Sequence, residues 1–308
     1  MIPLQRKQYR PAYIFFLCMF FGGSVFAADT RFADTTPFSS SKQALAYLDK
    51  IGELEQSRFW PNVHPQPFLQ NLRRNIEEPF GIYEGRSTNF CGYAALSYLP
   101  LHYDPLAFVT FMITIYRDGK AGYGKAYFEP SKEVKRYAGR LAFKGELDIR
   151  PADQLWFMVL ADHFKGYLNL FDRTYNPGDE NRFWASVNLA KFCRMIRKLF
   201  NYNVDAIGSD LLRPGVRDVY EYLSERLNNG HVALFVNNPG LYRKDHHRIK
   251  IGVPTHYIIL LDVEEVGDKI AFTYWDYGGR TRQLLSPETL KRIISGIIHI
   301  TPKLTHEK

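Results

Sequence analysis

The sequence predicts an α+β protein, with helices first and an antiparallel sheet after them. Apolar residues recur at helical spacing in several segments up to about residue 227, and short apolar runs bounded by turn residues follow. The 308 residues are 45% hydrophobic and 15% aromatic, which is enough for a packed core and excludes a disordered or collagen-like chain.

Residues 1–27 are typical of a secretory signal peptide. A basic start precedes an apolar centre at 12–21, and Val25 and Ala27 place small residues at the −3 and −1 positions of a cleavage site. We therefore expect cleavage after Ala27 and an exported protein, periplasmic or secreted. The alternative is an uncleaved inner-membrane anchor, for which the apolar stretch at 12–27 is short.

Ahead of the sheet, the pattern predicts a lead-in, an irregular segment and a series of helices. Residues 28–41 are polar and rich in Ser and Thr, as expected of a flexible lead-in, and 58–86 contains four prolines and is expected to be irregular. Helices are predicted over 44–54 (with Ser39 to Ser41 as candidate caps), 92–99, 106–116, 154–171, 188–202 and 216–227. The helix at 188–202 has an apolar stripe that includes Cys193 and a basic opposite face, which favours packing on the core over binding at a membrane surface.

The last third of the chain changes to strand-like patterns. Strands are predicted at 231–237, 256–262, 269–275 and 297–301. A helix that begins at Ser286 and Pro287 is expected between the last two strands.

Charge and cysteine content exclude several classes of protein. The chain carries 40 Lys and Arg against 32 Asp and Glu, a formal net charge of +8, but the basic residues are dispersed, so we expect no nucleic-acid partner. No apolar run of 18 residues follows residue 30, which indicates no stable membrane insertion after signal cleavage. Three cysteines are too few for a disulfide scaffold, although Cys91 and Cys193 could pair in an exported protein.

Cys91 is the first candidate catalytic residue. It lies in the segment 87–96 (STNFCGYAAL), where a polar loop leads into a helix of small residues. Unpaired amides and the helix dipole at such a position favour a thiolate over a thiol, so Cys91 is expected to be a competent nucleophile. The alternative is an inert, buried cysteine.

His256 and Asp276 form the second part of the candidate site. His256 begins a predicted strand and Asp276 follows the next one. If the hairpin loop is 264–268, centred on Val266, antiparallel pairing places the two residues directly opposite each other, with Cβ atoms about 5 Å apart. The carboxylate then holds the orientation and tautomer of the imidazole while the other ring nitrogen faces a nucleophile. The alternative is an ordinary hairpin flanked by a surface His and Asp.

This arrangement resembles the papain-like cysteine peptidases, and within them it is most similar to the bacterial branch around the double-glycine leader peptidases. The resemblance is carried by the segments 89–96 (NFCGYAAL), 230–235 (GHVALF), 255–260 (THYIIL) and 275–276 (WD). It implies a papain-like catalytic domain over 42–308, with the nucleophile at a helix start and a large helical insertion at about 100–200. It also implies a catalytic triad of Cys91, His256 and Asp276 that needs no cofactor and no metal.

The chain departs from the pattern of this family near the nucleophile. Relatives commonly carry a Gln about six residues before the cysteine as an oxyanion-hole donor, whereas this chain has Gly85. Asn89 is a substitute donor, together with the backbone amide of Cys91. Alternatively, Asn89 caps the helix. The separation between Cys91 and His256 also exceeds the roughly 130–150 residues typical of papain relatives.

The predicted function is an exported cysteine hydrolase, a peptidase or amidase, that cleaves a peptide or cell-wall peptide through an acyl-enzyme. Acyl transfer to an amine acceptor would use the same residues. Two alternatives remain: a non-catalytic papain-like binding or assembly module, and a cell-wall amidase that uses His231 as its base. Asp245, His246 and His247 suggest a metal site, but they lie among basic residues, which favours a solvated loop.

Overall fold

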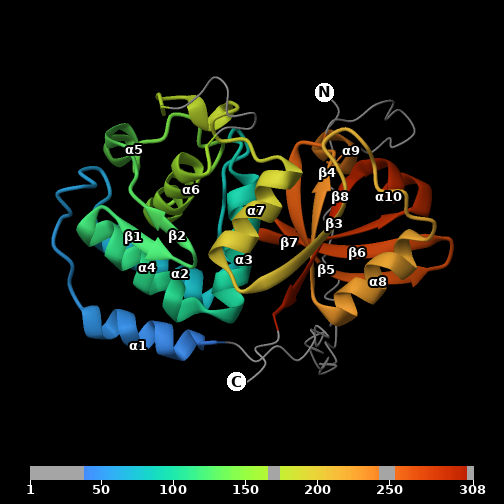
Figure 1. Cartoon of the computed structure of the whole chain (residues 1–308), viewed down its shortest axis with the longest axis horizontal. Helices are drawn as coiled ribbons and strands as arrows, with labels where there is room; N and C mark the ends of the chain where they lie inside the picture. Colours follow the sequence, from blue (N-terminus) through green and yellow to red (C-terminus); the bar gives the residue numbers. More distant parts are fainter. Residues whose placement is uncertain (1–37, 166–173, 243–253, 304–308) are drawn as a thin grey trace, which may run out of the picture. The chain divides into compact units, whose positions relative to one another are not determined.

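The computed structural model describes residues 38–165, 174–242 and 254–303 (Figure 1). The predicted α+β class is confirmed, since the described residues form ten α-helices and two antiparallel sheets. Seven of these described helices precede the larger sheet in the sequence, and the other three lie between its strands. The expected signal peptide and most of the expected lead-in lie outside the described residues.

The first part of the described chain is mainly helical. Its helices are α1 (Ser41–Ile51), α2 (Pro65–Glu77), α3 (Cys91–Tyr103), α4 (Pro105–Asp118), α5 (Lys132–Tyr137), α6 (Pro151–His163) and α7 (Leu189–Leu199). A small hairpin of β1 (Ala121–Tyr123) and β2 (Ala126–Phe128) lies between α4 and α5. Ser40, one of the candidate caps, forms a capping box with Gln43 at the start of α1.

Helix α2 corrects the expectation of an irregular segment at 58–86. Pro65 and Pro67 lie in its first turn, where the backbone N–H has no helical partner and the fixed φ of proline suits the helix. The prolines thus begin a helix of 13 residues that the sequence pattern did not reveal. Helix α3 likewise continues beyond its expected end, through Pro100 to Tyr103.

Asn71 of α2 caps the N-terminus of α6. The N-cap residue of α6, Arg150, makes no capping hydrogen bond with its own side chain. Asn71 Oδ1 accepts hydrogen bonds from the backbone N–H groups of Ala152 (2.9 Å) and Asp153 (3.1 Å). Because Asn71→Ala leaves these buried donors unpaired, we expect it to lower the free energy of unfolding by about 2 kcal/mol. Urea titration measures the loss beside Gln70→Ala, an exposed position on the same helix. Equal losses in the two variants would contradict this assignment.

The larger sheet has six antiparallel strands in the order β3-β8-β4-β5-β6-β7. The strands are β3 (Tyr202–Gly208), β4 (His231–Val236), β5 (His256–Val266), β6 (Lys269–Asp276), β7 (Gly279–Leu285) and β8 (Ile294–Pro302). The four predicted strands form its centre, and the two that the pattern missed are its edges. Edge strands are partly solvated, so they lack the continuous apolar run that marks a buried strand; in β7, exposed residues alternate with partly buried ones.

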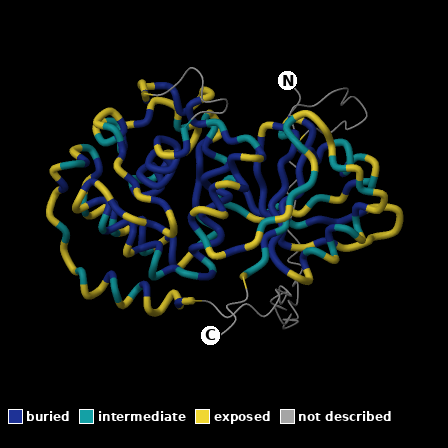
Figure 2. Tube along the Cα trace, in the orientation of Figure 1, coloured by how far each residue is buried: buried dark blue, intermediate teal, exposed yellow. Residues whose placement is uncertain are grey.

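The sheet is buried on both faces because alternate side chains of β4 enter different cores. Ala233 and Phe235 pack with α3 and α7, whereas Val232, Leu234 and Val236 pack with α8 (Val219–Asn229) and α10 (Pro287–Ile293). Figure 2 shows the central strands and α3 as predominantly buried, with the exposed residues on the outer helices and loops. Two candidate site residues lie at strand ends of this covered sheet, His256 at the start of β5 and Asp276 at the end of β6.

Candidate active site

Cys91 is the first residue of α3, and Phe90 is the N-cap of that helix. Helix α3 packs against β5 and carries the thiol to the beginning of that strand. The Cys91 S–H donates to the carbonyl oxygen of Thr255, with Sγ 3.7 Å from the oxygen. The structure therefore brings Cys91 to the residue that directly precedes His256.

The Cys91 thiol is protonated at neutral pH. Although part of the residue is exposed, burial of the sulfur raises its pKa to about 12; hydrogen bonding by the Tyr257 backbone opposes this shift and the charge of Glu84 adds to it. The expectation of a thiolate at the helix start is therefore wrong, because desolvation outweighs the helix amides. A base must accept the proton if Cys91 is to attack a carbonyl group.

His256 is the first residue of β5, and Asp276 is the last residue of β6. His256 Nε2 lies 3.0 Å from Asp276 Oδ2, and the two side chains are only 1% and 2% exposed. The Tyr242 hydroxyl, at the end of α9 (Asn238–Tyr242), donates a hydrogen bond to the same carboxylate oxygen. When Nε2–H donates to the carboxylate, Nδ1 keeps its lone pair, so the neutral imidazole is held in the tautomer of a base.

The strand register that joins His256 to Asp276 differs from the predicted one. The turn comes later than expected, because β5 continues to Val266, which pairs with Lys269. A β-bulge that follows Leu260 then shifts the register by one residue. This shift returns His256 and Asp276 to one face of the sheet as diagonal neighbours rather than directly opposed residues.

Tyr277 supports the imidazole from one side. The two rings are stacked, with centroids 4.5 Å apart and planes 8° from parallel. Asn238 Nδ2 donates to the Tyr277 hydroxyl at 3.0 Å. Tyr277 has a φ of +43°, a left-handed conformation that no other non-glycine residue of the described chain adopts. Such strained residues concentrate at functional sites, where the surrounding structure holds them in place.

Glu84 is a buried carboxyl group at this site that sequence reasoning missed. It is 2% exposed, and among the described residues its Oε2 has no hydrogen-bond partner. Burial raises the pKa of Glu84 to about 8; the backbone amides of Glu84 and Tyr277 oppose the shift and the charge of Asp276 adds to it. The charge of Glu84 also contributes to the raised pKa of the Cys91 thiol. At neutral pH Glu84 is mainly a neutral acid with an O–H to donate.

The conformation of Gly85 explains why no side chain is present six residues before the cysteine. Gly85 has a φ of +82°, and a Cβ atom there would lie 2.5 Å from the carbonyl oxygen of Lys144. A glutamine at this position would clash with the backbone and strain the turn. A buried polar side chain lies one residue earlier, at Glu84.

Asn89 takes neither of its two expected roles. Its side-chain amide donates to the carbonyl oxygen of Arg182 (3.0 Å) and to Ser186 Oγ (3.1 Å), and Phe90 is the N-cap of α3. Both donor hydrogens of the amide are thus used to fasten the loop before Cys91 to a neighbouring loop. Asn89 is therefore corrected from a candidate oxyanion donor or helix cap to a structural residue.

His231 and Cys193 lie away from the thiol of Cys91. His231 begins β4, whereas the other end of β4, at Val236, pairs with His256. Five residues of strand span about 17 Å, so the geometry contradicts His231 as the base for Cys91. Cys193 is 4% exposed within α7, and both cysteines are free thiols, so no disulfide bond joins them.

No protein-family model matches the chain, and neither a curated protein nor a solved structure matches it. Among the described residues, no helix is both long and apolar enough to cross a membrane, and no group of three His, Cys, Asp or Glu residues is placed to hold a metal ion. The Asp245 to His247 segment lies outside the described residues.

Proposed function

We propose that this chain is a cysteine hydrolase that cleaves amide bonds through an acyl-enzyme. Cys91 is the nucleophile, His256 is the general base and then the general acid, and Asp276 orients the imidazole. The observation that carries the proposal is the buried pair of His256 and Asp276, together with the Cys91 thiol that is hydrogen-bonded to the carbonyl oxygen of Thr255, the residue before His256. Nucleophilic acyl transfer uses a thiol as nucleophile, an imidazole that accepts its proton and a carboxylate that orients the imidazole.

The reaction begins from a neutral thiol. As Cys91 Sγ bonds to the substrate carbonyl carbon, its proton passes to His256 Nδ1 and the carbonyl oxygen becomes an oxyanion. The imidazolium then protonates the leaving nitrogen, the C–N bond breaks and a thioester remains. His256 next takes a proton from water, whose oxygen attacks the thioester; the carboxylic acid leaves and the Cys91 thiol is restored. The charge of Asp276 stabilises the imidazolium in both halves of the reaction.

Two groups are proposed to stabilise the oxyanion. One is the backbone N–H of Cys91, which has no partner within the first turn of a helix. The other is the protonated carboxyl group of Glu84, which takes the role of the glutamine amide of papain relatives. Because only the neutral acid can donate, this contribution is present below the pKa of about 8 and is lost above it.

The proposed substrate is a peptide or a cell-wall peptide, and the proposed location is the periplasm or the exterior of the cell. The resemblance to double-glycine leader peptidases supports a peptide substrate, and the pattern of residues 1–27 supports export. An amine in place of water would convert the same thioester into an acyl-transfer product. In this proposal, the segment at 100–200 is an insertion into a papain-like domain.

Alkylation by iodoacetamide at pH 7 tests the proposed pairing of Cys91 with His256. We expect Cys91 to react about 100-fold faster than it does in the His256→Ala variant, because the imidazole removes the thiol proton. Buried Cys193 provides an internal control within each sample, and peptide mapping by mass spectrometry measures both rates. If Cys91 reacts as slowly as Cys193, and His256→Ala has no effect, the hydrolase proposal fails.

The second candidate function is a non-catalytic binding or assembly module. One observation favours it: a thiol with a pKa of about 12 is inert unless a base acts on it. The same alkylation experiment separates the two functions, because an inert thiol has no dependence on His256. The stacked Tyr277 and the oriented imidazole then serve only to pack the end of the sheet.

A further inference from the structure

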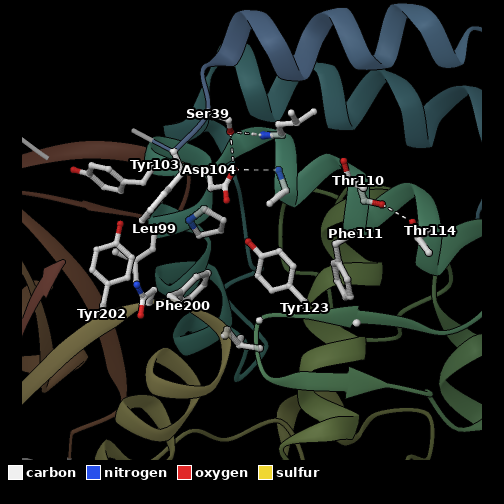
Figure 3. Close-up of a pocket in the computed structure, with 18 residues that line it drawn as sticks. Ser39, Leu99, Tyr103, Asp104, Thr110, Phe111, Thr114, Tyr123, Phe200 and Tyr202 are labelled. Atoms are coloured by element: carbon white, nitrogen blue, oxygen red, sulfur yellow. Dashed lines mark hydrogen bonds between the residues drawn. The ribbon is translucent and has the colours of Figure 1, made fainter. Parts of the chain in front are cut away.

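A cavity lies among α3, α4, the β1–β2 hairpin and the end of α7 (Figure 3). Its volume is about 650 Å³, which is in the range of sites that hold drug-sized molecules. None of the candidate active-site residues lines it. Most of the described residues that line it are apolar. Among these described residues, Asp104 is the one acidic side chain, and there is no Lys, Arg or His.

Four aromatic rings follow one another along this cavity, each nearly perpendicular to the next (Figure 3). The rings of Tyr103 and Tyr202 have centroids 6.3 Å apart and planes at 71°. The ring centroids of Tyr202 and Phe200 are 6.4 Å apart and the ring planes meet at 71°. For Phe200 and Tyr123 the centroid distance is 5.9 Å and the angle between the planes is 85°. All four residues line the cavity, and an ammonium group is attracted to the face of an aromatic ring.

Asp104 adds a negative charge to the same cavity. Its Oδ1 accepts hydrogen bonds from Ser39 Oγ (2.7 Å) and from the backbone N–H of Ala107 (3.3 Å), which caps α4. No basic side chain of the described chain forms an ion pair with this carboxylate. Asp104 and Tyr123 line the same cavity. Burial is the main cause that raises the pKa of Tyr123, and the Asp104 charge adds to it.

We propose that this cavity is a binding site for an organic cation, an ammonium group attached to an apolar body. An anionic ligand would meet the Asp104 carboxylate with no basic residue to attract it. A neutral ligand would displace water from this carboxylate and provide no charge in return. An ammonium group compensates the carboxylate and rests against the rings, while Leu99, Leu106 and Phe111 contact the apolar body.

Two probes of similar shape test the charge preference: 3-phenylpropylammonium and the uncharged 3-phenylpropan-1-ol. Dissociation constants are measured by NMR titration of the full chain. We expect the ammonium compound to bind about tenfold tighter or more, since it gains both the carboxylate and the ring faces. Equal affinity of the two probes, or binding of neither, overturns the proposal.

Asp104→Asn is the matched variant for the carboxylate. Asparagine caps a helix as well as aspartate does and keeps an oxygen for Ser39 and Ala107, so α4 is expected to remain folded. The preference for the ammonium probe should then fall to about threefold or less, because only cation–π attraction remains. An unchanged preference in Asp104→Asn places the cation elsewhere and overturns the assignment.

Phe200→Leu tests the rings and His256→Ala tests the location. Loss of the Phe200 ring should weaken the ammonium probe severalfold and the alcohol less, since a neutral group gains little from a ring face. His256→Ala should leave both affinities unchanged, so this site is judged independently of the proposed hydrolase. A loss of ammonium binding in His256→Ala instead assigns the probe to the candidate active site and overturns the proposal.

Discussion

His256→Ala is expected to slow peptide hydrolysis by about 10³- to 10⁴-fold, the range of a lost general base and acid. The physical reason is the state of the nucleophile. With a pKa of about 12, the Cys91 thiol is ionised only about once in 10⁵ molecules at pH 7, so attack depends on proton removal by His256. The initial rate of cleavage of a peptide library, followed by mass spectrometry, measures the effect.

The pH dependence of the residual rate distinguishes this mechanism from a structural effect. In the His256→Ala variant, the rate should rise about tenfold per pH unit between pH 7 and 10, because it follows the thiolate fraction. Asp276→Asn is the matched milder variant: its amide oxygen still accepts from Nε2, but the charge that stabilises the imidazolium is absent. We expect this variant to lose about tenfold to 100-fold. Hydrolysis that persists at the wild-type rate in His256→Ala excludes this residue as the base.

Replacement of Glu84 should separate two roles of its carboxyl group. Glu84→Ala removes an oxyanion donor and is expected to lower kcat by about 10²-fold or more. Glu84→Gln retains an N–H donor that does not titrate, so its activity should remain within about tenfold of wild type. Wild-type kcat should fall as the pH rises through about 8, where Glu84 loses its proton, and this fall should be absent in Glu84→Gln.

The same residue predicts a stability effect that does not depend on catalysis. The pKa of Glu84 is raised from its ordinary value of 4.5 to about 8 in the folded chain. Between these values the unfolded carboxyl group ionises while the folded one stays protonated, so stability falls as the pH rises. From pH 4.5 to 7 the loss amounts to about 3 kcal/mol, and Glu84→Gln should avoid it.

Urea unfolding of wild type and Glu84→Gln at pH 4.5 and pH 7 checks this linkage. The difference between the two proteins should move in favour of the variant as the pH rises. Parallel stability curves would mean that Glu84 is ionised in the folded state, and its proposed role as a hydrogen-bond donor would then be untenable.

Much of the fold was predictable because its signals are local. The apolar stripe of the α7 helix repeats at helical spacing, and β4 and β5 begin with continuous apolar runs. The edge strands β3 and β7 carry no such run, since their exposed side tolerates polar residues. The sequence pattern did not predict helix α2 because proline breaks a helix in its interior but favours a helix in its first turn, where Pro65 and Pro67 lie.

The candidate site was predictable by residue type but not by geometry. Cys91, His256 and Asp276 stand at recognisable positions, at the start of a helix and at the ends of two strands. Without the bulge after Leu260, however, the observed turn would place the imidazole and the carboxylate on opposite faces of the sheet. A bulge depends on how the whole strand pair packs, and no residue type in this hairpin predicts it.

The sequence by itself determined most of the buried helices and strands, and it placed Cys91, His256 and Asp276 at the ends of such segments, because these features depend on periodicity and on capping within a few residues. Only the tertiary structure decided the protonation states of the groups at the candidate site. Burial at the end of the sheet keeps the Cys91 thiol protonated and holds Glu84 as a neutral acid. Desolvation depends on every element packed around a group, so a buried carboxyl group and an exposed one look alike along the chain.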